Sequence, residues 1–143
     1  MRKLTAILVT LLIAVNALHA SEEQDVPWTE VRIVSPGIED TGEITFIATV
    51  NESDEWNSVE VGAFGQKYAL DEGQRKILKG YPASSISITY EPGYEQFGGH
   101  TVHWRFTRLD RSGEKVMEQD FIVSISKGKG LALREYNPTP AKN

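Results

Sequence analysis

Residues 101–126 carry the pattern that most restricts how this chain can fold. Two runs of alternating apolar and polar residues flank a polar turn, Asp110-Arg111-Ser112-Gly113. Because successive side chains of a β-strand point to opposite faces, each run predicts a strand with one apolar face. A single two-stranded ribbon is only marginally stable in water, so the predicted hairpin needs a second sheet to cover that face. The apolar positions of the hairpin are Val102, Trp104, Phe106, Phe121, Val123 and Ile125.

The register of this hairpin has two predicted forms, which differ in the partner of Arg105. A two-residue loop of Arg111 and Ser112 places Arg105 across from Glu118, whereas a four-residue loop over residues 111–114 places it across from Asp120. Both forms keep the apolar faces aligned, and either one predicts a cross-strand ion pair.

The rest of the chain supplies further short strands and one break in the alternation. Alternating runs occur near residues 28–33, 43–50, 59–63, 67–70, 84–90 and 131–136. Between residues 70 and 82 the pattern changes, because Asp71 is a good N-cap and Gln74 follows three residues later. We expect one or two turns of helix near residues 72–79, with a short edge strand at 75–78 as the alternative.

About seven or eight short strands, turns about every 8 to 12 residues and no long amphipathic helix predict an all-β protein, an antiparallel β-sandwich. The immunoglobulin-like form is the default of that architecture. The analogy concerns architecture only, because the chain has no cysteine and so lacks the Cys, Trp, Cys spacing of antibody domains. We expect the domain over residues 28–136, after a flexible lead-in at 21–27 and before a disordered tail at 137–143.

The first residues have the layout of a secretory signal peptide. Arg2 and Lys3 precede an uncharged run over residues 4–17, and the small residues Ala17 and Ala20 come before polar sequence. The run is about 14 residues long, short of the roughly 20 that a helix needs to cross a bilayer, so a retained anchor is the runner-up. We expect cleavage after Ala20, with cleavage after Ala17 open, and a periplasmic or secreted product that does not insert into the membrane.

Cleavage after Ala20 leaves 123 of the 143 residues and removes two of the 15 basic residues and none of the 20 acidic ones, which gives a net charge of −7. A chain this acidic, with no long basic stripe, argues against nucleic acid or an anionic membrane as partner. The absence of cysteine excludes a lipid-modified cysteine. It also fits a bacterial periplasm or exterior better than a eukaryotic secretory route.

No motif in the chain predicts nucleophilic catalysis or a nucleotide site. The sequence has no cysteine and no Gly-x-Ser-x-Gly elbow, and its paired glycines, Gly128 and Gly130, sit in a predicted hairpin rather than ahead of a helix. We therefore expect no catalytic residues and no cofactor.

The potential metal ligands are scattered. His100 and His103 are three residues apart, so on a strand their rings leave opposite faces of the sheet unless a bulge at Gly98-Gly99 turns His100. The acidic pairs at 39–40, 54–55 and 71–72 lack the regular spacing and central glycine of a calcium-binding loop. We expect solvated turn carboxylates, structural histidines and no metal site.

The loop over residues 91–100 provides the main binding candidates. Tyr94 and Phe97 are large apolar residues that neither flanking strand requires. Exposed aromatic side chains in a loop on a rigid scaffold often build a binding surface, and the alternative is that they fold back and plug the end of the sandwich. Trp56, in the turn after Asp54-Glu55, has the same two interpretations, and His100 completes the candidate set.

These observations favour a secreted or periplasmic, non-enzymatic module that binds a protein or glycan partner through its loops. An inhibitor or immunity-type protein is a more specific version of this hypothesis. The alternative is an extracytoplasmic hydrolase or metal-dependent enzyme, which requires His100, His103 and a carboxylate to converge in one cleft.

Overall fold

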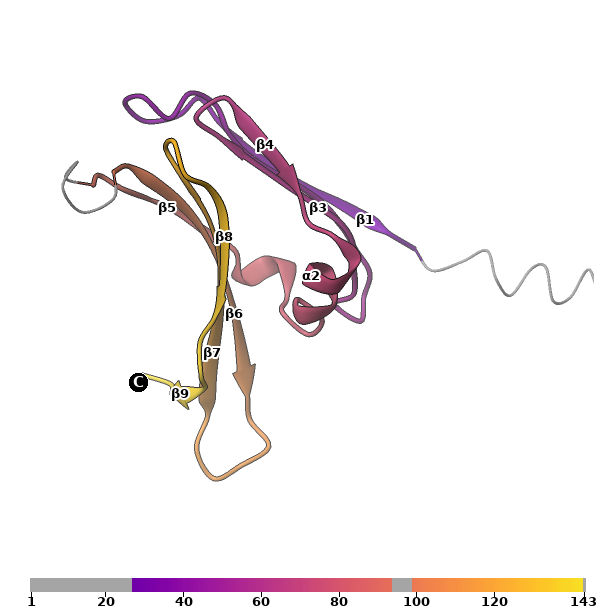
Figure 1. Ribbon diagram of the computed structural model, residues 1–143. Coiled ribbons are helices and arrows are strands. Elements are labelled where there is room, and N and C mark those ends of the chain that lie inside the picture. Colours follow the sequence, from indigo (N-terminus) through magenta and orange to yellow (C-terminus); the bar gives the residue numbers. More distant parts are fainter. Residues whose placement is uncertain (1–26, 94–98, 143) are drawn as a thin grey trace, which may run out of the picture.

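The computed structural model describes residues 27–93 and 99–142, which form two antiparallel sheets and one short α-helix (Figure 1). The first sheet has four strands: β1 (Thr29–Ser35), β2 (Ile44–Val50), β3 (Trp56–Ala63) and β4 (Gln66–Ala69). The second has five strands: β5 (Ser87–Glu91), β6 (Thr101–Asp110), β7 (Met117–Ser126), β8 (Gly130–Glu135) and the two-residue β9 (Thr139–Pro140), which pairs with β7.

The connection between the sheets contains α2 (Glu72–Ile77) and a short 3-10 helix, η1 (Ala83–Ser85). Asp71 caps α2, because its Oδ1 accepts a hydrogen bond from the Gln74 N–H at 2.8 Å. The Gln74 side chain in turn accepts from the Asp71 N–H at 2.9 Å. This capping box confirms the predicted helix over the edge-strand alternative, and α2 packs beside β3.

The inner faces of the two sheets share one hydrophobic core. The ring of Phe106 in β6 meets two rings of the first sheet edge-on, Phe46 in β2 at 5.8 Å and Trp56 in β3 at 5.6 Å between centroids. Trp104 and Phe121 are 0% and 1% exposed, so the predicted inward face of the hairpin is confirmed.

Apart from β9, each strand pairs with its neighbour in sequence, so the chain completes the first sheet before it starts the second. An immunoglobulin domain instead divides Greek-key strands between its sheets, which makes strands distant in sequence pair with one another. The pairings among the described residues thus show two antiparallel sheets around a common core, but they do not show an immunoglobulin topology.

Neither predicted hairpin register is correct. Asp110 pairs with Met117, which leaves residues 111–116 as the loop, and Arg105 lies across from Ile122. The guanidinium of Arg105 still reaches both predicted partners diagonally, contacting Asp120 and lying 3.8 Å from Glu118. A slip of two residues keeps every side chain on its face, so alternation alone does not distinguish these registers.

The C-terminal segment also differs from the predicted disordered tail. Within it, Thr139 pairs with Glu118 and Pro140 with Met117. The Ala141 N–H donates to the Val116 carbonyl at 2.9 Å. The segment therefore extends the second sheet beside the turn end of the β6–β7 hairpin, whose loop projects past α2 in Figure 1.

Asp120 connects the two long strands on the outer face of this hairpin. One of its carboxylate oxygens accepts from the Thr107 hydroxyl at 2.7 Å and the other from Arg105. Burial raises the pKa of Asp120, but the hydrogen bonds from Arg105 and Thr107 outweigh it and hold this pKa below its usual value.

A lowered folded-state pKa means that the Asp120 carboxylate stabilises the fold above its unfolded pKa of about 3.9, and that this contribution is lost as the pH falls through the folded value. Replacing Asp120 with asparagine should therefore lower the free energy of unfolding by about 1 to 2 kcal/mol near pH 7. In urea melts, the difference in the free energy of unfolding between variant and wild type should become smaller below about pH 4. Glu114→Gln, at an exposed loop carboxylate, controls for charge, and a gap that stays constant with pH would contradict the assignment.

Candidate functional site

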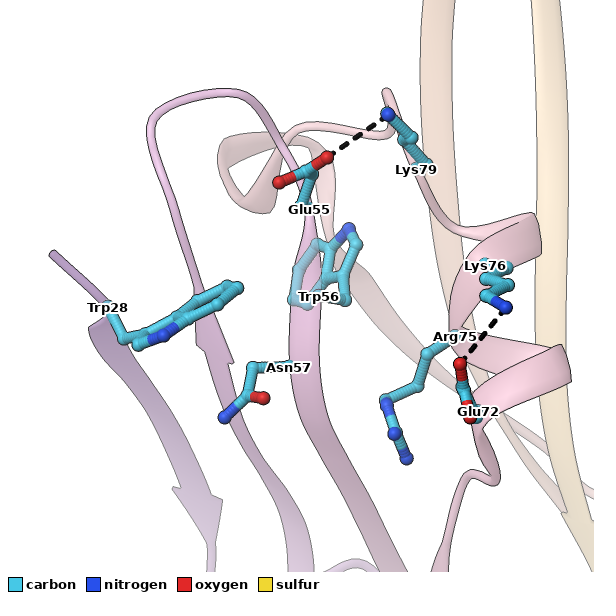
Figure 2. A pocket seen from close by; sticks show the side chains of 8 residues that line it. All are labelled: Trp28, Glu55, Trp56, Asn57, Glu72, Arg75, Lys76 and Lys79. Atoms are coloured by element: carbon cyan, nitrogen blue, oxygen red, sulfur yellow. Dashed lines mark ion pairs between the residues drawn. The ribbon is translucent and has the colours of Figure 1, made fainter. Parts of the chain in front are cut away.

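A groove of about 530 Å³ lies at one end of the first sheet, between the start of β1 and α2. In Figure 2 Trp28 forms one side, α2 forms the other, and Trp56 and Asn57 of β3 lie between them. The lining residues are Trp28, Glu55, Trp56, Asn57, Glu72, Arg75, Lys76 and Lys79.

A β-bulge in β3 sets the middle of the groove. Trp56 pairs with Val50 and Ser58 with Thr49, so Asn57 is an extra residue in the ladder. A bulge interrupts the alternation of side chains, and here it leaves both Asn57 and Ser58 exposed while Trp56 turns into the core. The polar amide of Asn57 is thereby presented at the groove surface.

Trp56 is a core residue that also lines this groove. It is 6% exposed, and its Nε1–H donates to the Tyr81 carbonyl at 3.2 Å. Its ring meets Phe46 and Phe106 edge-on, with centroid distances of 6.2 and 5.6 Å. Of the two interpretations offered by the sequence, the structure therefore shows the buried one.

Trp28, which sequence reasoning did not single out, is the exposed aromatic residue of the groove. Its side chain is 44% exposed, immediately before the edge strand β1. The signal was present in the sequence, because Trp28 has the same parity as Glu30 and Arg32 and so belongs to the polar side of its strand. Packing in the core does not explain why a large apolar ring occupies such a position.

Two of the three basic residues in the groove are neutralised by carboxylates. Lys76 lies 3.0 Å from Glu72, and Lys79 lies 3.0 Å from Glu55. A hydrogen bond from Lys76 lowers the pKa of Glu72. Hydrogen bonds, first from Asn51 and then from Lys79, lower the pKa of Glu55.

Arg75 is the exception among these cations. Its Nη1 donates to the Leu70 carbonyl at 2.7 Å, and no carboxylate within residues 27–93 and 99–142 forms an ion pair with it. A guanidinium has five N–H donors. The Leu70 carbonyl uses one of them and the Nε–H is buried, which leaves the other Nη donors for a partner. The groove therefore combines an exposed indole ring with a guanidinium that forms no ion pair among the described residues, although its charge helps to lower the pKa of Glu72.

The two histidines have different partners. His103 forms hydrogen bonds with the Ser124 hydroxyl at 2.7 Å and with Glu91 at 3.0 Å. His100 contacts the hydroxyl of Tyr90, and its Nδ1 lies 3.9 Å from Asp40 Oδ1. The two imidazoles therefore share no carboxylate among the described residues. The enzyme hypothesis required both of them to converge on one.

His100 does meet carboxylates that the sequence analysis had assigned to a solvated turn. Glu39, Asp40 and His100 bring one ligand atom each to within 4.8 Å of one another. Burial and the Glu39 carboxylate raise the pKa of Tyr90 to about 12. The Tyr90 hydroxyl is therefore protonated at neutral pH and donates to Glu39 Oε2 at 3.0 Å.

The other candidate residues, Tyr94 and Phe97, lie outside the described residues. In the part of the chain that the structure describes, no helix is long and apolar enough to cross a membrane. Comparisons of the chain with protein-family models, curated proteins and solved structures found no match.

Proposed function

We propose that this protein is an exported, non-enzymatic binding module, built on a β-sandwich, and that it recognises a protein partner through the groove between Trp28 and α2. The observation that carries the proposal is an exposed tryptophan that lines one groove together with an arginine, and this arginine forms no ion pair with a carboxylate of the described residues. Tryptophan and arginine are the residue types most enriched among the side chains that dominate binding energy at protein interfaces. The signal-like pattern of the first 20 residues supports export.

The walls of the groove favour binding because they are held before a partner arrives. Trp56 is fixed by its hydrogen bond to Tyr81 and its ring contacts, and α2 is fixed by the Asp71 cap. A site held in this way loses little conformational freedom on association. The expected partner segment presents an apolar side chain to Trp28 and a carboxylate to Arg75.

A glycan remains the second partner class. A sugar ring can stack on the indole of Trp28 and accept or donate hydrogen bonds at Asn57, and a neutral sugar does not need the charge of Arg75. Loss of the Arg75 charge therefore distinguishes the two classes. Tyr94, Phe97 and His100 stay in the proposal as a second contact region.

Affinity capture from an extracytoplasmic extract, with bound proteins and glycans quantified, tests the proposal. Trp28→Ser should reduce capture about tenfold or more, the effect of removing a dominant interface residue. Its free energy of unfolding should change by no more than about 0.5 kcal/mol, because the ring is at the surface. Arg75→Gln should reduce capture of a protein partner and leave a neutral glycan unaffected.

Tyr136→Ser is the matched control, because Tyr136 is another aromatic residue of similar exposure, 39%, at the end of β8. It should capture as wild type does. If Trp28→Ser captures the same partner in the same amount, the groove is not the binding site. A loss confined to a Tyr94→Ser, Phe97→Ser double variant would place recognition in the loop instead.

A further inference from the structure

We propose that Glu39, Asp40 and His100 form a site for a divalent transition-metal ion of the Zn²⁺ type. The site lies beyond the opposite end of β1 from Trp28, and it is independent of the function proposed for the groove. Nothing in the sequence pattern predicts it, because its ligands come from connections next to two different sheets.

The donors converge from segments that are far apart in the chain. Glu39 and Asp40 lie in the turn between β1 and β2, whereas His100 directly precedes β6 in the other sheet. All three ligand atoms lie within 4.8 Å of one another, and the imidazole Nδ1 is 3.9 Å from Asp40 Oδ1. The cluster is therefore more than an acidic turn, since a nitrogen donor from the second sheet faces its carboxylates.

The separations are close to those of a coordination sphere. Two donors at about 2.1 Å from a tetrahedral Zn²⁺ ion lie about 3.4 Å apart. Distances of 3.9 to 4.8 Å must then shorten by about 0.5 to 1.4 Å. Glu39 and Asp40 are exposed and His100 is half-buried, so rotation of these side chains can supply that movement.

Tyr90 holds two of the ligands in place. Its ring stacks on His100 with 5.8 Å between centroids and 15° between planes. Its hydroxyl donates to Glu39 Oε2 at 3.0 Å, and a hydrogen bond of this kind orients a ligand side chain around a bound metal. The same hydroxyl contacts His100 Nδ1, so it has to move off this nitrogen when Nδ1 binds an ion.

The donor set selects the class of ion. One imidazole nitrogen with two carboxylate oxygens suits Zn²⁺ and similar transition metals, whereas Ca²⁺ and Mg²⁺ prefer oxygen ligands alone. With three protein ligands, water completes the coordination of such an ion.

Lys127 provides a test that distinguishes a metal site from a cluster of side chains that only stabilises the fold. Its ammonium group lies 2.5 Å from Asp40 Oδ2, which leaves Oδ1 as the oxygen that faces His100. This ammonium repels a second cation. Removing it should therefore tighten metal binding, even though an ion pair is lost.

A bound ion connects the β1–β2 turn to the second sheet and should stabilise the fold, because it binds the native state in preference to the unfolded chain. At saturating ZnCl₂ the melting temperature of the metal-free protein should rise by about 5 °C or more, and MgCl₂ or CaCl₂ should shift it by less than about 1 °C. Isothermal titration with ZnCl₂ should give one site per chain.

The variants separate the site from unspecific zinc binding. His100→Ala and Glu39→Gln should each weaken Zn²⁺ binding about tenfold or more. His103→Ala, which removes an imidazole paired with Glu91 and Ser124, should bind as wild type does. Lys127→Met should bind about threefold more tightly or better.

Titration at low temperature keeps the variants folded, so the affinities can be compared directly. Zn²⁺ binding that survives His100→Ala, or that falls equally in His103→Ala, would overturn the proposal. So would a Ca²⁺ response equal to that of Zn²⁺. None of these outcomes bears on capture by the groove, so the two proposals fail separately.

Discussion

Replacing Trp104 with alanine should lower the free energy of unfolding by about 3 to 5 kcal/mol. Trp104 is fully buried in β6, where it pairs with Ile88 on one side and Val123 on the other. Truncation removes the ring and leaves a cavity between two sheets that hydrogen-bonded ladders hold in place. Small domains have a total stability of about 5 to 15 kcal/mol, so this one change removes a large share of it.

Urea and thermal melts of the purified variant check this expectation, with Trp28→Ala as the matched control. Trp28 is a tryptophan in the same protein with 44% exposure, and its loss should change stability by no more than about 0.5 kcal/mol. A Trp104→Ala variant that melts within about 2 °C of wild type would show that the assigned inward face is wrong.

The strands and their buried faces could be predicted because alternation records which side of a strand meets the core. The pairing of those strands could not. Registers that differ by two residues bury the same side chains, which is why Arg105 pairs across from Ile122 and not from either predicted carboxylate. Sheet order is equally invisible to alternation, since every strand has an apolar face whichever neighbour it has.

Local chemistry was more informative where it involves the backbone directly. Asp71 and Gln74 predicted α2 correctly, because a capping box satisfies specific N–H groups at a helix start. The β3 bulge was not visible in the sequence. Trp56 and Val59 are three residues apart, a spacing that puts two side chains on opposite faces of a regular strand. The extra residue Asn57 turns both of them inward, which is why alternation alone could not place Trp56 in the core.

The candidate sites depend on contacts across the fold, and the sequence predicted little of them. Trp28 and Arg75 line one groove only because β1 and α2 flank the same end of β3. Glu39 and His100 meet only because the two sheets pack face to face. The sequence analysis compared His100 only with His103 and expected their rings to leave opposite faces of the sheet, whereas the structure places His100 near Asp40 in the β1–β2 turn.

Trp56 allows the structural and the recognition roles of the groove to be separated. Trp56→Ala should lower the free energy of unfolding by about 3 to 5 kcal/mol, because it removes a ring that is packed on Phe46 and Phe106. Trp56→Phe should cost about 1 to 2 kcal/mol, since an aromatic ring remains but the Tyr81 carbonyl loses its donor. Urea melts of both variants measure these losses.

The two tryptophans of the groove should then behave in opposite ways. Trp28→Ser should keep its stability and lose partner capture, whereas Trp56→Phe should lose stability and, in its folded fraction, keep most of its capture. If Trp56→Ala were as stable as wild type, the ring of Trp56 would lie at the surface. Trp56 would then again be a candidate for direct contact with the partner. If Trp28→Ser and Trp56→Phe lost capture equally while both proteins stayed folded, the result would mean that the partner contacts the edge of the Trp56 ring as well as the exposed ring of Trp28.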